Sequence, residues 1–176
     1  ICPKGSHLDD IHNITYKEIS LKPLPIFLIA GLFHAIKISL EFKPNIILAG
    51  SGLTSPIAWL TARLMGAISA TYVHGLDIVV NHIVYQSIWL PFIRAQDYLI
   101  ANSHHTLQLA HNKGVDEKKI RVLHPGVSLA NPKMPEASFS AFRDQHQIHA
   151  QYIFISVGRL TQRKGLKEFI QFIFLT

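Results

Sequence analysis

The sequence predicts an α/β fold: a doubly wound parallel sheet with helices on both faces, followed by the beginning of a second unit. Short apolar runs of strand length alternate with longer segments of helical pattern, and the links between them are short. This alternation is typical of parallel sheets. The chain has 176 residues, of which 48% are hydrophobic and 16% are charged. It is therefore long enough for one domain with a buried core, and its composition is that of a globular protein.

The expected strands are apolar runs bounded by glycine, proline or asparagine. They cover residues 14–20, 45–50, 69–75, 97–102 and 119–126. Residues 1–5 are typical of the end of a strand that enters a turn. The run at 45–50 is short and continuously apolar, as a strand buried in a parallel sheet requires.

The expected helices have apolar residues at helical spacing and recognisable ends. They cover residues 26–40, 54–66, 84–96 and 103–114. Thr54 or Ser55 is a suitable N-cap for the second helix, Gly66 is a stop signal for it, and Ser103 is a suitable N-cap for the last. Pro91 lies within the third helix, where it should kink or end the helix.

Residues 130–151 differ from the preceding part of the chain and predict a linker. Pro132 and Pro135 interrupt this stretch, and Ser138 is a suitable cap for a short helix within it. After the linker, residues 152–158 have the composition of a strand and residues 165–174 have the pattern of a helix. They predict the first strand, turn and helix of a second unit.

The charge of the chain is mildly basic, with a formal net charge of +6 and a pI of about 9.6. This balance suits a phosphorylated substrate, an anionic lipid surface or a nucleic acid, and equally a solvated basic face. The sequence contains no recognition motif for nucleic acid and no interleaving of aromatic and basic residues, so we expect no nucleic-acid partner. The single cysteine, Cys2, excludes an internal disulfide and suits a reducing, cytoplasmic setting.

The most apolar stretch is the expected helix at residues 26–40. His34 and Lys37 interrupt it, so it falls short of the roughly 18 apolar residues that a spanning helix needs. We expect a helix buried in a core, and contact with a membrane is the alternative. The N-terminus has no charged leader followed by an apolar stretch and a cleavage site, so a signal peptide is not expected.

Candidate functional residues follow the expected strands. In open parallel sheets, ligands bind beyond the carboxyl ends of the strands. The turns at these ends are Gly50-Ser51-Gly52, His74-Gly75, Asn102-Ser103, Pro125-Gly126 and Gly158-Arg159. Such glycines either let the backbone approach a ligand or simply form the turns.

The turn at Gly158 has the strongest chemical signal. Glycine lets the backbone approach a phosphate, and the N-terminus of a following helix offers free N–H groups. Arg159 can bind phosphate oxygens in bidentate fashion and Lys164 adds a mobile positive charge, while Arg163 is either a further phosphate ligand or solvated. The chain contains neither a G-x-x-x-x-G-K-[ST] loop nor a G-x-G-x-x-G motif. P-loop NTPases and NAD-type dehydrogenases are therefore not supported.

His74 follows an apolar strand and precedes Gly75 and Asp77. It is a candidate general acid or base, a candidate hydrogen-bond donor to a substrate hydroxyl, or a structural residue. The other histidines of the chain, which has 11 in all, do not combine with cysteine or acidic residues at the spacing of a zinc site, so we expect no metal. No Ser/His/Asp order or G-x-S-x-G turn stands out.

The order of these motifs resembles that of the group-1/family-4 retaining glycosyltransferases, which have two Rossmann-like domains in a GT-B arrangement. The most specific similarity is FISVGRLTQRKGLKEFI at residues 154–170, which resembles the opening of the C-terminal, donor-binding domain of that family. Supporting similarities are YVHGLDI, LIANSHHTLQLAHNKGV and KIRVLHPGVSL, at residues 72–78, 99–115 and 119–129. They follow one another as in the N-terminal domain of the family, and the resemblance covers nearly the whole chain.

The resemblance implies transfer of a sugar from a nucleotide-sugar donor, with retention, to a glycan or lipid-linked acceptor, as in the synthesis of cell-envelope polysaccharide or glycolipid. Gly158, Arg159 and Lys164 would bind the donor diphosphate without a metal or another cofactor, and His74 would face the reaction centre. Further candidates to line the cleft between the domains are Gly52, Asp77, Ser103 and Gly126. Family members usually have asparagine and aspartate around the last of these turns, where this chain has Pro125 and Ser128.

The resemblance also implies domain boundaries. Residues 1–129 would be the N-terminal, acceptor-side domain without its first strand and glycine-rich loop, residues 130–151 a linker, and residues 152–176 a truncated start of the donor-binding domain. The chain alone would then be a catalytically incomplete piece. We expect a cytoplasmic protein. Peripheral contact with the inner face of the plasma membrane is a further expectation. The alternative function is an acceptor- or membrane-binding piece without catalysis.

Overall fold

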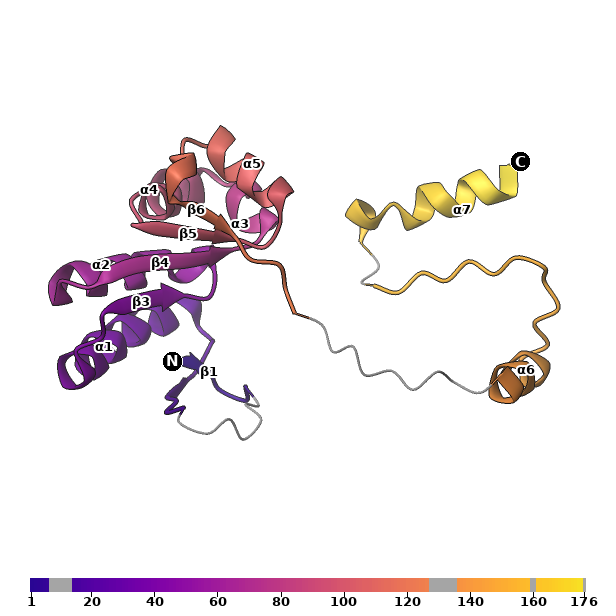
Figure 1. The fold of residues 1–176 in the computed structure, drawn as a ribbon, viewed down its shortest axis with the longest axis horizontal. Coiled ribbons are helices and arrows are strands. Elements are labelled where there is room, and N and C mark those ends of the chain that lie inside the picture. Colours follow the sequence, from indigo (N-terminus) through magenta and orange to yellow (C-terminus); the bar gives the residue numbers. More distant parts are fainter. Residues whose placement is uncertain (7–13, 127–135, 159–160, 176) are drawn as a thin grey trace. The chain divides into compact units, whose positions relative to one another are not determined.

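The computed structural model describes residues 1–6, 14–126, 136–158 and 161–175. The chain forms two compact units, Ile1–Val127 and Ser128–Thr176, which are described separately (Figure 1). The division falls two residues before the end of the N-terminal domain expected at residue 129.

The first unit is built on a parallel sheet. Its strands are β3 (Ile46–Ala49), β4 (Ile68–Val73), β5 (Tyr98–Ala101) and β6 (Ile120–Val122), in the order β3-β4-β5-β6. All three neighbouring pairs are parallel, and the last residues are in register, since Val73 pairs with Ala101 and Ala101 with Val122. The carboxyl ends of the strands therefore lie at one edge of the sheet, as the sequence predicted.

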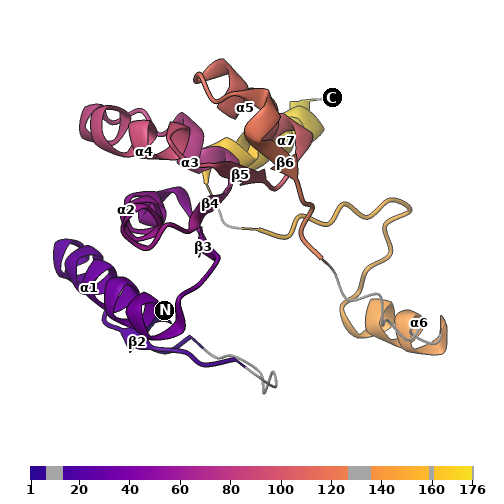
Figure 2. The ribbon, with the colours of Figure 1, turned by 60° about the vertical axis from the view of Figure 1, so that its left-hand side comes forward.

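The helices that connect these strands are α2 (Ser55–Met65), α3 (Gly75–Val79), α4 (Leu90–Arg94) and α5 (His104–Asn112). Ser55 of α2 is hydrogen-bonded to Thr71 of β4 at 2.8 Å between the hydroxyl oxygens. The core cluster combines strand residues with residues of the other connections: Val73, Ile78, Ile93, Leu99, Ala101, Ala110, Val115 and Ile120. Figure 2 shows α2, α3 and α4 on the same side of the strands.

In the described part of this sheet, the helices that connect the four strands lie on one face. Ile46 and Leu48, which point to the opposite face from the core, are 59% and 56% exposed. The strands follow one another across the sheet in chain order. Because crossovers between parallel strands are right-handed, each connection then places its helix on the same face.

The helical stretch before β5 shows how the chain accommodates a proline. A π-turn (Tyr85–Trp89) leads directly into α4, and Pro91 occupies the first turn of that helix. Proline has no N–H and its ring displaces the carbonyl one turn back, so a widened turn in front of it relieves the conflict. The predicted helix at 84–96 is thus confirmed, with Pro91 widening it rather than ending it.

The N-terminal segment contains α1 (Leu24–Phe42) and a short parallel pair, β1 (Cys2–Pro3) with β2 (Glu18–Ile19), so only two residues of the strand expected at 14–20 pair. Gly31 brings α1 close to α2, because a methyl group on it would lie 3.1 Å from Cδ1 of Ile57. Only Phe27, Gly31 and Ser39 of α1 are buried.

The prediction that this helix lies buried in a core is therefore wrong for most of its surface. Four large apolar side chains of α1, Ile26, Ile29, Phe33 and Leu40, are 60–70% exposed. They repeat at helical spacing on the side opposite to the buried residues. The helix is also long and apolar enough to cross a membrane, by length and composition.

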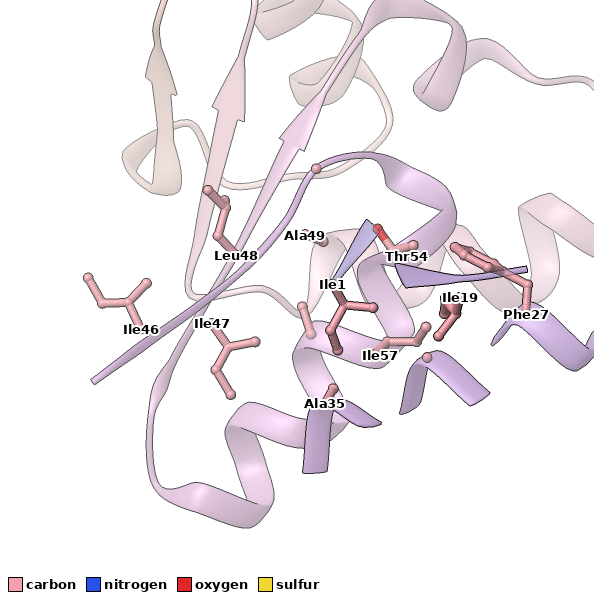
Figure 3. Close-up of a pocket in the computed structure, with 13 residues that line it drawn as sticks. Ile1, Ile19, Phe27, Ala35, Ile46, Ile47, Leu48, Ala49, Thr54 and Ile57 are labelled. Atoms are coloured by element: carbon pink, nitrogen blue, oxygen red, sulfur yellow. The ribbon is translucent and has the colours of Figure 1, made fainter. Parts of the chain in front are cut away.

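An apolar pocket of about 300 Å³ lies beside the unpaired edge of β3 (Figure 3). Ile47 and Ala49 line it from the strand, Ile19 from β2, Phe27 from α1 and Ile57 from α2. Of the candidate turns, only Gly50 reaches this pocket, and His74, Asp77, Gly52 and Ser103 do not line it. It is a packing gap between the β1–β2 pair, α1 and the sheet.

The second unit contains α6 (Glu136–Gln145), a 3₁₀ turn (Gln162–Lys164) and α7 (Leu166–Leu175). Helix α6 begins before Ser138, so this serine is not its cap. The strand expected at 152–158 is not formed, and Ile155 and Val157 are 82% and 92% exposed. A strand needs a hydrogen-bonded neighbour, and the described residues of this unit offer none. Phe154 nevertheless contacts Phe169 of α7 edge-on, with ring centroids 5.7 Å apart.

Candidate functional site

His74 directly follows β4 and precedes α3, a short helix that the sequence did not predict. Its backbone N–H donates to Oδ2 of Asp77 over 2.8 Å, so the carboxylate satisfies one of the free donors at the start of α3. The imidazole is exposed and meets the ring of Tyr72 edge-on, at 5.1 Å between centroids. The Tyr72 hydroxyl in turn donates to the carbonyl oxygen of Leu123 at 3.1 Å.

A chain of polar side chains continues from His74 into α5. Nδ2 of Asn102 lies 3.2 Å from Nδ1 of His74, and the hydroxyl of Thr106 donates to Oδ1 of Asn102 over 2.6 Å. Ser103 is the N-cap of α5, as predicted: its Oγ accepts the backbone N–H of Thr106 and donates to Oγ1 of Thr106, both at 3.1 Å.

The strand register explains why these residues meet. Val73 is paired with Ala101, so the residues that follow them, His74 and Asn102, leave the sheet side by side. The backbone N–H of Asn102 also donates to the carbonyl of Val73 over 3.3 Å. A histidine and an amide are thereby held by the two central strands at the carboxyl ends of the strands, where ligands bind in open parallel sheets.

Gly52 lies at the same edge, after β3, and is buried beneath Asp77 and Tyr85. A methyl group on Gly52 would lie 2.8 Å from Cβ of Asp77 and 2.7 Å from the hydroxyl oxygen of Tyr85. Burial, together with the Asp77 carboxylate, raises the pKa of Tyr85 from 10.0 to about 12. The tyrosine ring stacks on Trp89, with centroids 5.9 Å apart and planes within 5°.

The first unit thus brings together most of the residues predicted for it. Asp77 accepts the backbone N–H of His74 and lies against Gly52. Ser103 is hydrogen-bonded to Thr106, which in turn donates to Asn102. Gly126, after β6, is exposed, and a methyl group on it would meet no atom within 4 Å. Whether these residues line a cleft stays a prediction.

Sequence reasoning noticed Asn102 only as a strand end, and it missed Thr106 and Tyr85. The N-cap pattern at Ser103 was a usable signal for Thr106, because a capping serine bonds the N–H three residues later. No local signal pointed to Tyr85, which reaches Gly52 from the middle of the connection between β4 and β5.

In the second unit, the predicted phosphate-binding residues are partly described. The side chain of Lys164 comes back towards Gly158, with its Cε 4.0 Å from the position that a Cβ of Gly158 would occupy. Gly158 and Lys164 are therefore neighbours. Arg159 lies outside the described residues.

No group of three or more histidine, cysteine or acidic side chains within the described residues could hold a metal ion. The expectation of a reaction without metal or cofactor stays a prediction.

The decisive comparison is with protein families. Residues 1–131 of the chain match the model of Glycosyltransferase Family 4. The chain belongs to this family. Among curated proteins, none matches the chain.

Solved structures support the fold of this glycosyltransferase family member. Anabaena Alr3699/HepE in complex with UDP-glucose matches with a TM-score of 0.67 and 14% identity, over 86% of this chain and 41% of that one. The same protein in complex with UDP matches with a TM-score of 0.66, also at 14% identity and over 86% of this chain, and over 42% of that chain. The apo form of the lipopolysaccharide outer core galactosyltransferase WaaB matches at 0.50 and 16% identity, over 71% of this chain and 36% of that one.

The family 4 chain therefore spans less than half the length of these solved relatives. At 14–16% identity the likeness concerns the fold. It agrees with the predicted Rossmann-like, GT-B class, of which the sheet β3-β4-β5-β6 is the described part.

Proposed function

We propose that the protein transfers a sugar from a nucleotide-sugar donor to a glycan or lipid-linked acceptor, with retention of the anomeric configuration. The observation that carries the proposal is the position of His74, held by Asp77 and Asn102 at the ligand-binding edge of a family 4 fold. Anabaena HepE, which shares the fold, has been solved with UDP-glucose and with UDP, which supports a nucleotide-sugar donor.

The donor diphosphate is the leaving group of such a transfer, so negative charge grows on it in the transition state. Gly158 lets the backbone approach the phosphates, while Arg159 and Lys164 supply positive charge. Cations placed in advance stabilise this charge most effectively, because they need not reorganise during the reaction. With two cations in this role, the reaction needs no metal.

The test is steady-state kinetics of the protein with nucleotide-sugar donors. We expect Arg159→Ala and Lys164→Ala each to lower kcat by roughly 10²–10³-fold, the range for loss of one charge-stabilising donor. Lys167→Ala, on the exposed surface of α7, is the matched control and should leave the rate unchanged. Normal turnover of the Arg159 and Lys164 variants would contradict the proposed diphosphate site. The anomeric configuration of the product, read by NMR, decides the question of retention.

His74 is proposed to contact the donor sugar at the reaction centre. His74→Ala should lower kcat strongly while the unfolding temperature stays within a few degrees, since the imidazole is exposed. An unchanged kcat would remove this role and leave the histidine a structural residue of the edge.

A role in cell-envelope synthesis implies contact with lipid-linked acceptors, and α1 offers a surface for it. We propose that the exposed face of α1, Ile26, Ile29, Phe33 and Leu40, rests on the anionic inner face of the plasma membrane. Lys37 lies on the same face, and Lys22 and Lys43 flank the helix, against one carboxylate at Glu41. Apolar area combined with flanking lysines favours anionic bilayers.

Co-sedimentation with vesicles tests this contact. Vesicles rich in phosphatidylserine should bind the protein, and neutral phosphatidylcholine vesicles should bind it less. Ile29→Ser with Phe33→Ser should abolish binding, while Ile83→Ser, which removes an 85% exposed isoleucine elsewhere, should not. Equal binding of all variants would reject α1 as the contact. Vesicle binding without any sugar transfer would favour the alternative, a membrane- or acceptor-binding piece without catalysis.

A further inference from the structure

The hydrogen bonds that link Ser103, Thr106, Asn102 and His74 have assignable donors and acceptors. The backbone N–H of Thr106 donates to Oγ of Ser103, and the Ser103 hydroxyl donates to Oγ1 of Thr106. The hydroxyl of Thr106, a residue only 2% exposed, is then left to donate, and its partner at 2.6 Å is Oδ1 of Asn102. A carboxamide oxygen only accepts, so this contact orients the whole amide of Asn102.

With Oδ1 occupied by Thr106, the amide presents its NH₂ group to His74. An NH₂ group donates and cannot accept, so Nδ1 of His74 must be the acceptor and carry no proton. The proton of the neutral ring then sits on Nε2. In the described part of the chain Nε2 has no protein partner, and the imidazole is exposed at the edge of the sheet.

We propose that Asn102, oriented by Thr106 and Ser103, is a positioning residue that holds His74 in the Nε2–H tautomer. This inference rests on the proposed function, in which His74 faces the donor sugar. Nε2 then acts as a hydrogen-bond donor to a hydroxyl or phosphate oxygen of the substrate. Nε2 cannot act as a base in this tautomer, because its lone pair is part of the aromatic π system. The basic nitrogen, Nδ1, faces the amide of Asn102. The geometry thus favours the role of hydrogen-bond donor for His74 over the role of general base, both of which the sequence left open.

The choice of an amide supports this reading. A carboxylate at position 102 would accept a hydrogen bond from Nδ1–H and would therefore favour the other tautomer or the imidazolium ion. The amide of Asn102, whose oxygen already accepts from Thr106, offers His74 only its NH₂ group and favours a neutral ring. Asn102→Asp is nearly identical in shape and should therefore change the protonation of His74 in one of two ways. Either the neutral ring carries its proton on Nδ1 and loses the Nε2–H donor, or the ring becomes a positively charged imidazolium ion.

The experiment is NMR of the protein labelled with ¹⁵N in its histidines, at a pH where the imidazole is neutral, with the His74 signals assigned by their loss in His74→Gln. In the wild type, Nδ1 should give a pyridine-type signal and Nε2 a pyrrole-type signal. Asn102→Asp should exchange the two patterns or give the imidazolium pattern, and should lower kcat by about 10- to 100-fold with little change in KM. Asn112→Asp, the same change on the exposed end of α5, should alter neither.

A wild-type ring with the proton on Nδ1 would overturn the proposal, and this measurement does not depend on how any position-102 variant folds. An unchanged pattern in Asn102→Asp would overturn it as well. The readout needs no activity, so the two proposals fail separately. An Nε2–H ring in a protein whose His74→Gln variant keeps full activity would reject the catalytic role of His74 and keep the tautomer assignment.

Discussion

Gly52 lies so close to Asp77 that a methyl group on the glycine would be 2.8 Å from the Cβ of the aspartate. Asp77 is also the residue that accepts the backbone N–H of His74. The absence of a side chain at position 52 therefore permits the arrangement that holds the histidine. Gly52 has no positive φ angle, so the requirement for glycine here is one of space rather than of backbone conformation.

The first prediction is that Gly52→Ala damages both stability and activity. The new methyl group must displace Asp77 or Tyr85, and overpacking of this kind costs about 1–3 kcal/mol. Denaturant unfolding measures the cost and kcat reports the displaced His74. Gly50→Ala is the matched control, because a methyl group there meets no atom within 4 Å. Equal effects of the two substitutions would contradict the packing argument.

The second prediction is that Tyr85→Phe partly rescues Gly52→Ala. The Tyr85 hydroxyl is the atom nearest to the new methyl group, at 2.7 Å. It is buried, and among the described residues it has no hydrogen-bond partner, so its removal leaves no polar group unpaired. We expect Tyr85→Phe alone to be neutral or slightly stabilising. In a double-mutant cycle of unfolding free energies, additive effects would exclude a clash with this hydroxyl.

The third prediction concerns alkaline pH. The pKa of Tyr85 is raised from 10.0 to about 12, so the folded state favours the neutral phenol. The resulting stabilisation is present below pH 10 and is lost as the pH rises through about 12. Across that window the wild type should lose stability relative to Tyr85→Phe, while the difference stays constant below it. The measurement runs from about pH 9, one unit below the ordinary pKa of 10.0, to about pH 12, the shifted pKa. A difference in unfolding free energy that does not change over this range would reject the raised pKa.

The fourth prediction separates two functions of Asp77. Asp77→Asn keeps an oxygen that accepts from the N–H of His74, whereas Asp77→Ala leaves this N–H without its partner. Loss of such a cap costs about 1 kcal/mol. We therefore expect kcat and the unfolding temperature to fall in Asp77→Ala and to fall much less in Asp77→Asn. Equal losses in the two variants would show that the charge of Asp77 matters more than its position.

Much of the edge that carries His74 could be predicted from the sequence. Alternation of strands and helices implies a parallel sheet, and in a parallel sheet the residues that follow the strands must gather at one edge. His74, Ser103 and Gly52 were placed correctly at the strand ends by this argument alone. The alternation of elements does not determine the strand register, and the register decides that His74 meets the side chain of Asn102.

The features that the sequence left open or predicted wrongly also have physical causes. The alternation of elements does not contain the order of strands across the sheet, and that order decides which face the helices cover. Residues 152–158 have strand composition, yet a strand exists only where a neighbouring strand completes its hydrogen bonds. Helix α1 is apolar on nearly every side, so its pattern did not reveal which side would be exposed.

The last prediction concerns the opposite edge of the sheet, where Asp97 links the starts of β4 and β5. Its Oδ2 accepts from the backbone N–H and the hydroxyl of Ser69 at 2.9 and 2.8 Å, and its Oδ1 lies 3.1 Å from Nη2 of Arg63. Burial acts to raise the pKa of Asp97, but the hydrogen bonds from Ser69 and the charge of Arg63 outweigh it, so the pKa is lowered from 3.8.

A carboxylate with a lowered pKa stabilises the folded state above its ordinary pKa, and this contribution is lost as the pH falls through the lower, folded-state value. Asp97→Asn should therefore destabilise the protein by about 1 kcal/mol at neutral pH, where hydrogen bonds to the charged group are lost. The difference from the wild type should shrink as the pH falls below about 4. Unfolding free energies measured across this range test the prediction, with Glu41→Gln, an exposed carboxylate on α1, as the control. A difference that is the same at neutral and at acid pH would mean that the Asp97 side chain contributes through its shape and not through its charge.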